Sequence, residues 1–266
     1  AWQAWRDDAQ RPALLHFASV EAHPVGASAL AASAAAYPEL APLAAELARA
    51  WTGLLPGVHR LAFEQGQVLL TVVIGEAPEA LRHLDSAFDA LFLDGFDPER
   101  NPVMWSEAML AAAARRLKPD ARAASWCVAG AVRERLAGCG FEVERVPGLP
   151  PKRHCLRAVY QPRRAEGGAV PTVARGLRAP HPLAGGAREA LVVGGGLAGA
   201  AVAASLARRG WRITVLDAGA APGAGASGLP AGLAAPHVSP DDSPLSRITR
   251  AGVRATLTRA AERLRL

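Results

Sequence analysis

A glycine-rich loop between a short apolar strand and a helix constrains this chain more than any other feature. Residues 191–193 predict a short apolar strand, and residues 194–199 read Gly-Gly-Gly-Leu-Ala-Gly, which matches the pattern G-x-G-x-x-G. Small residues continue through a predicted helix that ends at Gly210, and residues 213–216 predict a second strand closed by Asp217. A strand, a glycine turn, a helix and a second strand in this order predict a β–α–β unit.

Each glycine of this loop has its own expected task. Gly194 makes a tight turn, Gly196 lets the backbone approach a pyrophosphate, and Gly199 lets the helix pack closely on the strand. The N-terminus of the helix offers unpaired N–H groups and a positive dipole end to phosphates. Asp217 follows Gly199 by 18 residues, near the spacing of about 20 residues at which an acid binds ribose hydroxyls. We therefore expect a site for the ADP half of FAD or NAD, with the acid disfavouring NADP.

A second run of small residues follows this unit. Residues 225–228 read Gly-Ala-Ser-Gly, and residues 232–236 read Gly-Leu-Ala-Ala-Pro. Small side chains at Ala226, Ser227 and Gly228 would let the loop lie against a cofactor. The alternative interpretation is an ordinary surface loop.

The first part of the chain alternates between apolar runs and helical patterns. The expected strands are residues 14–20, 59–63, Val68–Ile74, Phe88–Leu93, 121–128, 141–146 and 155–160. The expected helical stretches are residues 27–51, broken by Pro38 and Pro42, 104–117 and 131–137. The second and third strands are close enough to form a hairpin. The alternation predicts an α/β fold with a sheet dominated by parallel strands.

Acidic residues stand at or just after the ends of three predicted strands. Glu21 ends the first, Gly75 and Glu76 follow Val68–Ile74, and Asp94 closes Phe88–Leu93. Because ligands of open α/β sheets bind beyond the carboxyl ends of the strands, the three acids are expected on one rim. Their spacing favours a nucleoside site, although a single acid in such a place is commonly a loop residue or a helix cap.

Composition narrows the class of protein further. Half of the 266 residues are hydrophobic, yet we find no apolar run long enough for a transmembrane helix and no signal peptide at the N-terminus. The three cysteines fit no metal-binding or redox spacing, so we expect reduced thiols in a cytoplasmic protein without a metal. The net charge of +6 comes almost entirely from arginine. This charge is compatible with RNA as a partner, and a GC-rich genome that favours arginine codons is the alternative explanation.

Several segments together resemble one family, the bacterial bifunctional tRNA 5-methylaminomethyl-2-thiouridine biosynthesis proteins (MnmC). The resembling stretches are residues 17–24 (FASVEAHP), 37–43 (YPELAPL), 55–63 (LPGVHRLAF), 88–105 (FDALFLDGFDPERNPVMW), 148–156 (GLPPKRHCL), 190–217 and 225–228. The stretch at residues 88–105 is the most specific of them, and the glycine loop is the least specific.

The resemblance implies a fold and two activities. It implies a Rossmann-like methyltransferase sheet over residues 1–160, a linker over residues 161–188, which are rich in Pro, Gly, Arg and Ala, and the start of a Rossmann FAD-binding domain over residues 189–266. The FAD-dependent domain would remove a carboxymethyl group from a wobble-uridine substituent of tRNA. The methyltransferase domain would then methylate the freed amine with S-adenosylmethionine.

The resemblance also implies roles for individual residues. Glu21, Gly75 and Glu76 would bind S-adenosylmethionine, and Asp94 would accept or orient a proton of the substrate amine. A base is needed there because an ammonium group has no lone pair with which to attack a methyl group. Four further residues would contact the substrate or the tRNA backbone; these are Asn101, Trp105, Lys152 and Arg153.

The chain departs from the family pattern in several places. A first strand with a glycine loop is missing before Glu21, Glu76 and Leu229 stand where the family has Asp and Asn, and residues 126–128 read Trp-Cys-Val rather than a hydroxyl-rich segment. The oxidase part is expected to continue beyond Leu266, so we expect weak FAD binding by these residues alone. Two alternatives remain at this point, namely an FAD amine oxidase fused to a non-catalytic RNA-binding module, and a truncated product that binds nothing well.

Overall fold

A computed structural model describes residues 1–84, 86–162 and 188–264 of the chain. Most of the predicted linker, residues 163–187, lies outside the described residues. The contacts divide the chain into two units. One unit holds residues 1–19 and 23–74 together with the C-terminal part of the chain, and the other holds residues 20–22 and the stretch that begins at residue 75.

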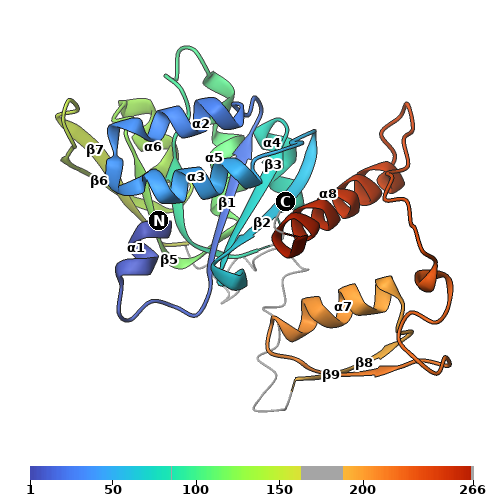
Figure 1. Cartoon of the computed structure of the whole chain (residues 1–266). Coiled ribbons are helices and arrows are strands. Elements are labelled where there is room, and N and C mark those ends of the chain that lie inside the picture. The colour runs from blue at the N-terminus through green and yellow to red at the C-terminus, as the bar shows by residue number, and fades with distance from the viewer. Residues whose placement is uncertain (85, 163–187, 265–266) are drawn as a thin grey trace, which may run out of the picture. The chain divides into compact units, whose positions relative to one another are not determined.

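The N-terminal residues form a three-stranded sheet with helices (Figure 1). Its elements are α1 (Trp2–Asp7), β1 (Leu15–Glu21), α2 (Ala27–Ser33), α3 (Ala41–Ala50), β2 (Gly57–Phe63) and β3 (Val68–Ile74). The strand order is β1-β3-β2, and β2 and β3 form the predicted antiparallel hairpin around the turn Glu64–Gly66. The N–H of Leu15 bonds Gln67 and the N–H of Gly75 bonds Glu21, so β1 runs parallel to β3.

A small apolar core supports this sheet. Its buried members are Trp5, Leu61, Phe63 and Val68. The indole of Trp2 packs against the Phe63 ring with centroids 4.5 Å apart, and its Nε1 donates to Glu64 at 3.0 Å. The short helix at the N-terminus is therefore held to the hairpin by aromatic packing, by this hydrogen bond and by an ion pair between Arg6 and Glu64 at 3.3 Å.

The second unit contains a four-stranded sheet. Its elements are α4 (Ala77–Ala80), β4 (Phe88–Leu93), the 3-10 turn Pro102–Trp105, α5 (Glu107–Ala114), β5 (Leu117–Ser125), α6 (Gly130–Gly138), β6 (Phe141–Pro147) and β7 (His154–Tyr160). The strand order is β4-β5-β7-β6. Six of its core side chains are at most 2% exposed: Trp105, Leu110, Ala121, Val132, Leu136 and Leu156.

The sheets are mixed, which corrects the expectation of mostly parallel strands. β4 and β5 are parallel, whereas β7 runs antiparallel to both β5 and β6. Only residues 148–153 connect β6 to β7, and a connection of that length joins antiparallel neighbours because a parallel crossover needs a dozen residues or more. Apolar patterns identify strands without giving their direction, so connection length was the better guide here.

Two predicted boundaries in this unit shift by a few residues. The helix expected over residues 104–117 is limited to Glu107–Ala114, and Ser106 caps it by accepting the N–H of Met109 at 3.2 Å. β5 begins at Leu117 and ends at Ser125, so Trp126 lies in the loop after the strand rather than inside it.

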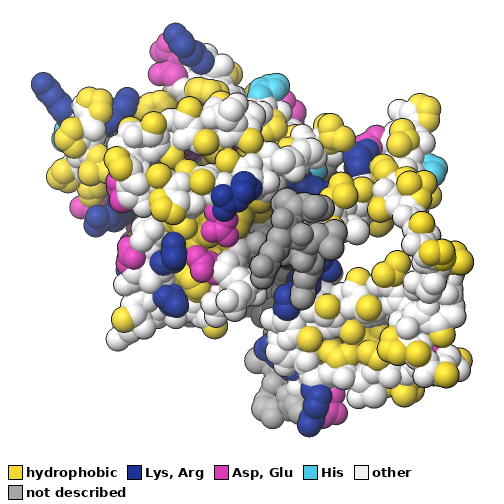
Figure 2. All heavy atoms as spheres, in the orientation of Figure 1, with side chains coloured by type: hydrophobic (Ala, Val, Ile, Leu, Met, Phe, Trp, Pro, Cys, Tyr) yellow, Lys and Arg dark blue, Asp and Glu magenta, His cyan; other side chains and the backbone are white. Residues whose placement is uncertain are grey.

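The C-terminal residues form the predicted β–α–β unit, followed by a long helix (Figure 1). β8 (Glu189–Val193) and β9 (Arg212–Leu216) pair in parallel, with α7 (Leu197–Ala207) between them in the chain. None of the α7 residues is buried, and Val193 and Leu197 are 82% and 74% exposed. Figure 2 shows the corresponding apolar side chains gathered over this unit.

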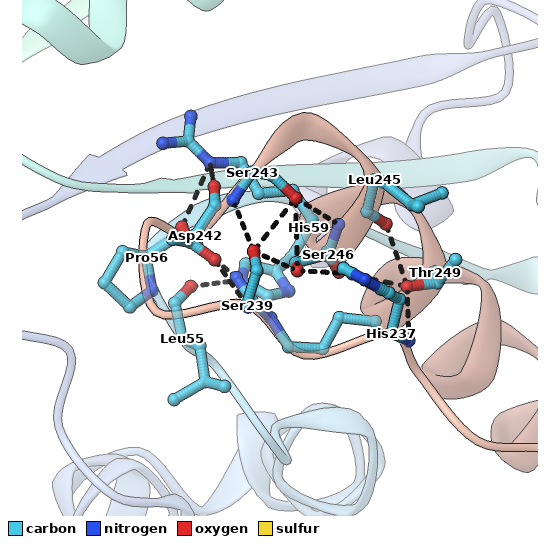
Figure 3. A network of polar contacts seen from close by, with 12 residues as sticks. Leu55, Pro56, His59, His237, Ser239, Asp242, Ser243, Leu245, Ser246 and Thr249 are labelled. Atoms are coloured by element: carbon cyan, nitrogen blue, oxygen red, sulfur yellow. Dashed lines mark hydrogen bonds and ion pairs between the residues drawn. The ribbon is translucent and has the colours of Figure 1, made fainter.

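The long helix α8 (Pro244–Leu264) was not predicted from the sequence. Its first turn belongs to a hydrogen-bonded network in which Ser246 contacts His237, Ser239 and Ser243 (Figure 3). Further along the helix, Arg254 donates to Nδ1 of His59 at 2.6 Å and to the carbonyl of Ala50 at 3.1 Å. These bonds connect the helix to β2 and to the end of α3 within the same unit.

Candidate cofactor and substrate sites

At the first candidate site, each fixed position of the loop pattern requires glycine for a different structural reason. Gly194 adopts φ +104°, a conformation that L side chains rarely adopt, and its N–H bonds the carbonyl of Leu216 at 2.7 Å. A Cβ at Gly196 would lie 2.8 Å from Oγ of Ser227. A Cβ at Gly199 would lie 2.9 Å from the carbonyl carbon of Gly194 and nearer still to its oxygen. The turn expected at Gly194 and the close packing expected at Gly199 therefore have structural counterparts, whereas Gly196 lies against the side chain of Ser227, and the approach of a pyrophosphate to it stays a prediction.

The loop at residues 225–228 lies at the beginning of α7. Oγ of Ser227 accepts the N–H of Leu197, the first residue of the helix, at 3.0 Å. A side chain at Gly228 would meet the carbonyl oxygen of Gly223 at 2.6 Å, so the turn Ala226–Gly228 packs tightly. Since Ser227 binds an N–H group at a helix N-terminus, its hydroxyl occupies the kind of position that phosphate oxygens take.

Asp217 is fixed at the end of β9 by the loop itself. Its Oδ2 accepts the N–H of Gly195 at 2.5 Å and its Oδ1 accepts the N–H of Gly219 at 2.7 Å. These two backbone hydrogen bonds, that from Gly195 first, lower the pKa of the Asp217 carboxyl below its usual value. Each carboxylate oxygen has a further lone pair with which it can accept a hydroxyl of a ribose.

These groups fit the ADP half of a dinucleotide. The glycine cradle excludes side chains at three positions, α7 supplies backbone N–H groups for a pyrophosphate, and Asp217 supplies an acceptor for a ribose. The structure therefore places the predicted residues Gly194, Gly196, Gly199 and Asp217 in one loop region, with Ser227 beside it.

The second candidate site begins with two neighbouring strand ends. Glu21 is the last residue of β1, and its carbonyl accepts the N–H of Gly75 at 3.0 Å. Gly75 adopts φ +155°, and Glu76 follows immediately as an exposed residue before α4. The backbone pairing thus brings Glu21 and Glu76 to adjacent strand ends, where two carboxylates can accept hydrogen bonds from a nucleoside.

Asp94 is exposed directly after β4, and two indoles hold the loop that follows it. Nε1 of Trp105 donates to the carbonyl of Phe96 at 2.6 Å, and Nε1 of Trp126 donates to the carbonyl of Gly95 at 3.1 Å. A Cβ at Gly95 would lie 3.3 Å from the Trp105 ring, so the loop passes close over this side chain.

The position of Trp105 corrects one expectation. Its side chain is 1% exposed, and its indole N–H donates to the carbonyl of Phe96. Trp105 therefore supports the loop from inside rather than contacting a substrate. Asn101 remains half-buried just before the 3-10 turn, where its backbone N–H bonds Asp97 at 2.8 Å. The sequence pattern identified the right segment but could not separate its supporting residues from its accessible ones.

Lys152 and Arg153 are exposed on the turn between β6 and β7. The N–H of Gly148 bonds the carbonyl of Arg153 at 3.0 Å, and a side chain at Gly148 would meet the carbonyl of Lys152 at 2.7 Å. Nζ of Lys152 lies 4.7 Å from the ring centroid of Trp126, which is a cation–π distance. Sequence reasoning noted Trp126 only as a departure from the family, although an aromatic residue just after a strand end was a usable signal.

Two further properties concern the whole described chain. Within residues 1–84, 86–162 and 188–264, no helix has the length and apolarity needed to cross a membrane. Within the same residues, no three His, Cys, Asp or Glu side chains come together as metal ligands. Cys127, Cys139 and Cys155 are free thiols.

In the comparisons with known proteins, two regions of the chain match two different enzyme classes. Residues 38–161 match the family model of an S-adenosyl-L-methionine-dependent methyltransferase. Residues 189–265 match that of an FAD-dependent oxidoreductase. The chain thus contains methyltransferase and FAD oxidoreductase regions, in that order.

Relatives with both regions define the family more narrowly. A tRNA 5-methylaminomethyl-2-thiouridine biosynthesis bifunctional protein MnmC from Paracidovorax citrulli is 57% identical over 96% of this chain. The protein of the same name from Delftia acidovorans is 53% identical over 97% of the chain. This chain belongs to that family, and it spans about 40% of the length of these two relatives.

Proposed function

We propose that the protein takes part in a two-step modification of the wobble uridine of tRNA. An FAD-dependent step removes the carboxymethyl group from 5-carboxymethylaminomethyl-(2-thio)uridine, and a methylation dependent on S-adenosylmethionine then gives 5-methylaminomethyl-(2-thio)uridine. The observation that carries this proposal is the identity of 57% over 96% of the chain with a bifunctional relative named for this product.

The proposed domain boundaries follow from the same comparison. We place the methyltransferase domain at residues 1–160, a linker at 161–188 and the beginning of the oxidoreductase domain at 189–266. The two family matches, to residues 38–161 and 189–265, support this division. The reduced thiols and the nature of the substrate favour action in the cytoplasm.

In the methylation step, residues of this chain bind the cofactor, orient the substrate amine and accept its proton. S-adenosylmethionine supplies the methyl group when it is bound. Glu21 and Glu76 accept hydrogen bonds from its nucleoside part, because both carboxylates stand at adjacent strand ends. Asp94 accepts or orients the proton of the substrate ammonium, which frees the nitrogen lone pair for attack. The two indole N–H groups fix the loop after Asp94 and so restrict where its carboxylate can point.

In the oxidative step, the described residues hold the ADP half of the cofactor. FAD supplies the electron acceptor when it is bound. The α7 N-terminus and Ser227 would hold its pyrophosphate, and Asp217 would accept hydrogen bonds from its ribose. An acid at this position repels the extra phosphate of NADP.

The test uses the longest polypeptide that the gene encodes and tRNA that lacks the modification. We expect a flavin absorbance spectrum, and methyl transfer from labelled S-adenosylmethionine to tRNA that carries the 5-aminomethyl group. Gly196→Val should abolish the flavin spectrum and leave methyl transfer intact. Flavin binding without any methyl transfer would instead support an oxidase fused to a non-catalytic RNA-binding module.

A further inference from the structure

A hollow of about 470 Å³ lies in the second unit, at the end of the sheet that carries Asp94. Three segments form it: residues 97–99 after β4, residues 126–129 after β5, and residues 152–154 between β6 and β7. Its volume lies within the range of about 300–1,000 Å³ that is typical of small-molecule sites. Because β4 and β5 are parallel, the first two segments both lie beyond carboxyl ends of strands, where α/β sheets bind ligands.

Trp126 is the aromatic side chain of this hollow, and it is held in place before any ligand arrives. Its Nε1 donates to Gly95, and its ring makes an edge contact with Trp105 at a centroid distance of 6.4 Å and an interplanar angle of 87°. The half-buried indole therefore has a fixed orientation. Nζ of Lys152 lies over its face, so this face is covered by an exposed cationic side chain and not by the protein core.

The charges around the hollow differ from one side to the other. Asp97 and Glu99 are exposed on the segment after β4, and Lys152 and Arg153 are exposed on the opposite turn. Among the described residues, no salt bridge joins these two pairs. Their charges are therefore available to a ligand that has a cationic end and an anionic end.

We propose that this hollow holds the target nucleotide of the RNA substrate, with its base stacked on the indole of Trp126. The proposal rests on the proposed function, because a 5-aminomethyl uridine has such a pair of ends, a cationic amine on the base and an anionic phosphate. The amine lies toward Asp94 and Asp97, and the phosphate lies toward Arg153. Lys152, whose side chain is exposed, leaves the indole face to the base and binds a phosphate.

Two variants of Trp126 separate stacking from the hydrogen bond to Gly95. Trp126→Phe retains an aromatic face but loses the N–H donor, whereas Trp126→Leu loses both. Bases that stack on aromatic residues lose affinity by roughly 5- to 150-fold when the ring is removed. We therefore expect Trp126→Leu to weaken binding of an anticodon stem-loop with 5-aminomethyluridine by that factor, and Trp126→Phe to weaken it by less than about threefold.

The control is Trp51→Phe, since Trp51 also donates its indole N–H to a carbonyl, that of Val25 at 2.8 Å, but lies in the other unit. Dissociation constants come from titration of the longest encoded polypeptide, and circular dichroism checks that each variant folds. Equal losses in the Phe and Leu variants would overturn stacking and leave only a role in holding the loop. Unchanged binding in both would overturn the proposal altogether.

A second measurement covers the case in which Trp126→Leu fails to fold. Stacking quenches indole fluorescence, so the stem-loop should quench part of the emission of the wild type, and this part should be missing in Trp126→Phe. Equal quenching in both proteins would refute the proposed contact. The methyl-transfer assay of the wild type decides the proposed function separately, because quenching and binding are measured without S-adenosylmethionine.

Discussion

Replacing Gly199 with alanine tests the physical basis of the dinucleotide site. The new Cβ would lie 2.9 Å from the carbonyl carbon of Gly194, whereas ordinary contacts begin at 3.4 Å, and the carbonyl oxygen is nearer still. The first turn of α7 must therefore retreat from the loop by at least about 0.5 Å. Overpacking of this kind costs about 1–3 kcal/mol. If the binding-competent conformation bears the whole cost, flavin affinity falls by about 5- to 150-fold.

The assay is a titration with FAD, followed by flavin fluorescence, on the longest polypeptide that the gene encodes. Gly232→Ala is the matched control, because its Cβ would meet nothing within 4 Å and its φ is not in the left-handed region. Gly194→Ala should also weaken binding, through backbone strain of about 1–2 kcal/mol. Equal FAD affinity of Gly199→Ala and Gly232→Ala would refute close packing as the reason for a glycine at position 199.

Three other predictions concern the methyltransferase site and the contact with α8. Asp94→Asn should lower the rate of methyl transfer by about 10²- to 10⁴-fold with little change in tRNA affinity, as measured by single-turnover kinetics, because it removes the proton acceptor. Arg153→Gln should reduce the slope of log affinity for tRNA against log salt concentration by about 1, and an unchanged slope would exclude a phosphate contact. Burial, together with the charges of Arg254 and Arg250, lowers the pKa of His59 below its ordinary value of 6.5, so the folded state binds fewer protons than the unfolded state. The neutral form of His59 should therefore contribute to the free energy of unfolding above pH 6.5. This contribution should be lost as the pH falls below 6.5. Thermal unfolding of His59→Gln should show a weaker loss of stability over this range than the wild type does.

Local patterns predicted the parts of the fold that depend on neighbouring residues. The hairpin of β2 and β3, the strand Phe88–Leu93 and the β–α–β unit all lie where the sequence places them. These elements have strong signals, which are apolar runs, a short polar turn and a glycine at each sharp bend. The direction of β7 was missed because it depends on the connection to β6 and not on the composition of the strand.

The site was predicted in outline and not in detail. The spacing of Asp94 to Trp105 predicted a functional segment, but the sequence could not show that Trp105 is buried and Trp126 is not. Burial is a property of packing between distant segments, as the hydrogen bond from Trp126 to Gly95 illustrates. The long helix α8 was missed because its sequence from Pro244 on alternates small, polar and basic residues without a clear apolar stripe.

The apolar surface of the β8–α7–β9 unit has a consequence for the behaviour of this chain in solution. Leu191, Val193, Leu197, Val202 and Leu216 are all at least half exposed. Exposed hydrocarbon of this kind attracts apolar surface of another molecule, and the attraction strengthens with the salts that are often added to stabilise proteins. The 266 residues by themselves should therefore self-associate as concentration rises while each molecule is still folded, whereas further sequence of the length found in the relatives can cover this surface.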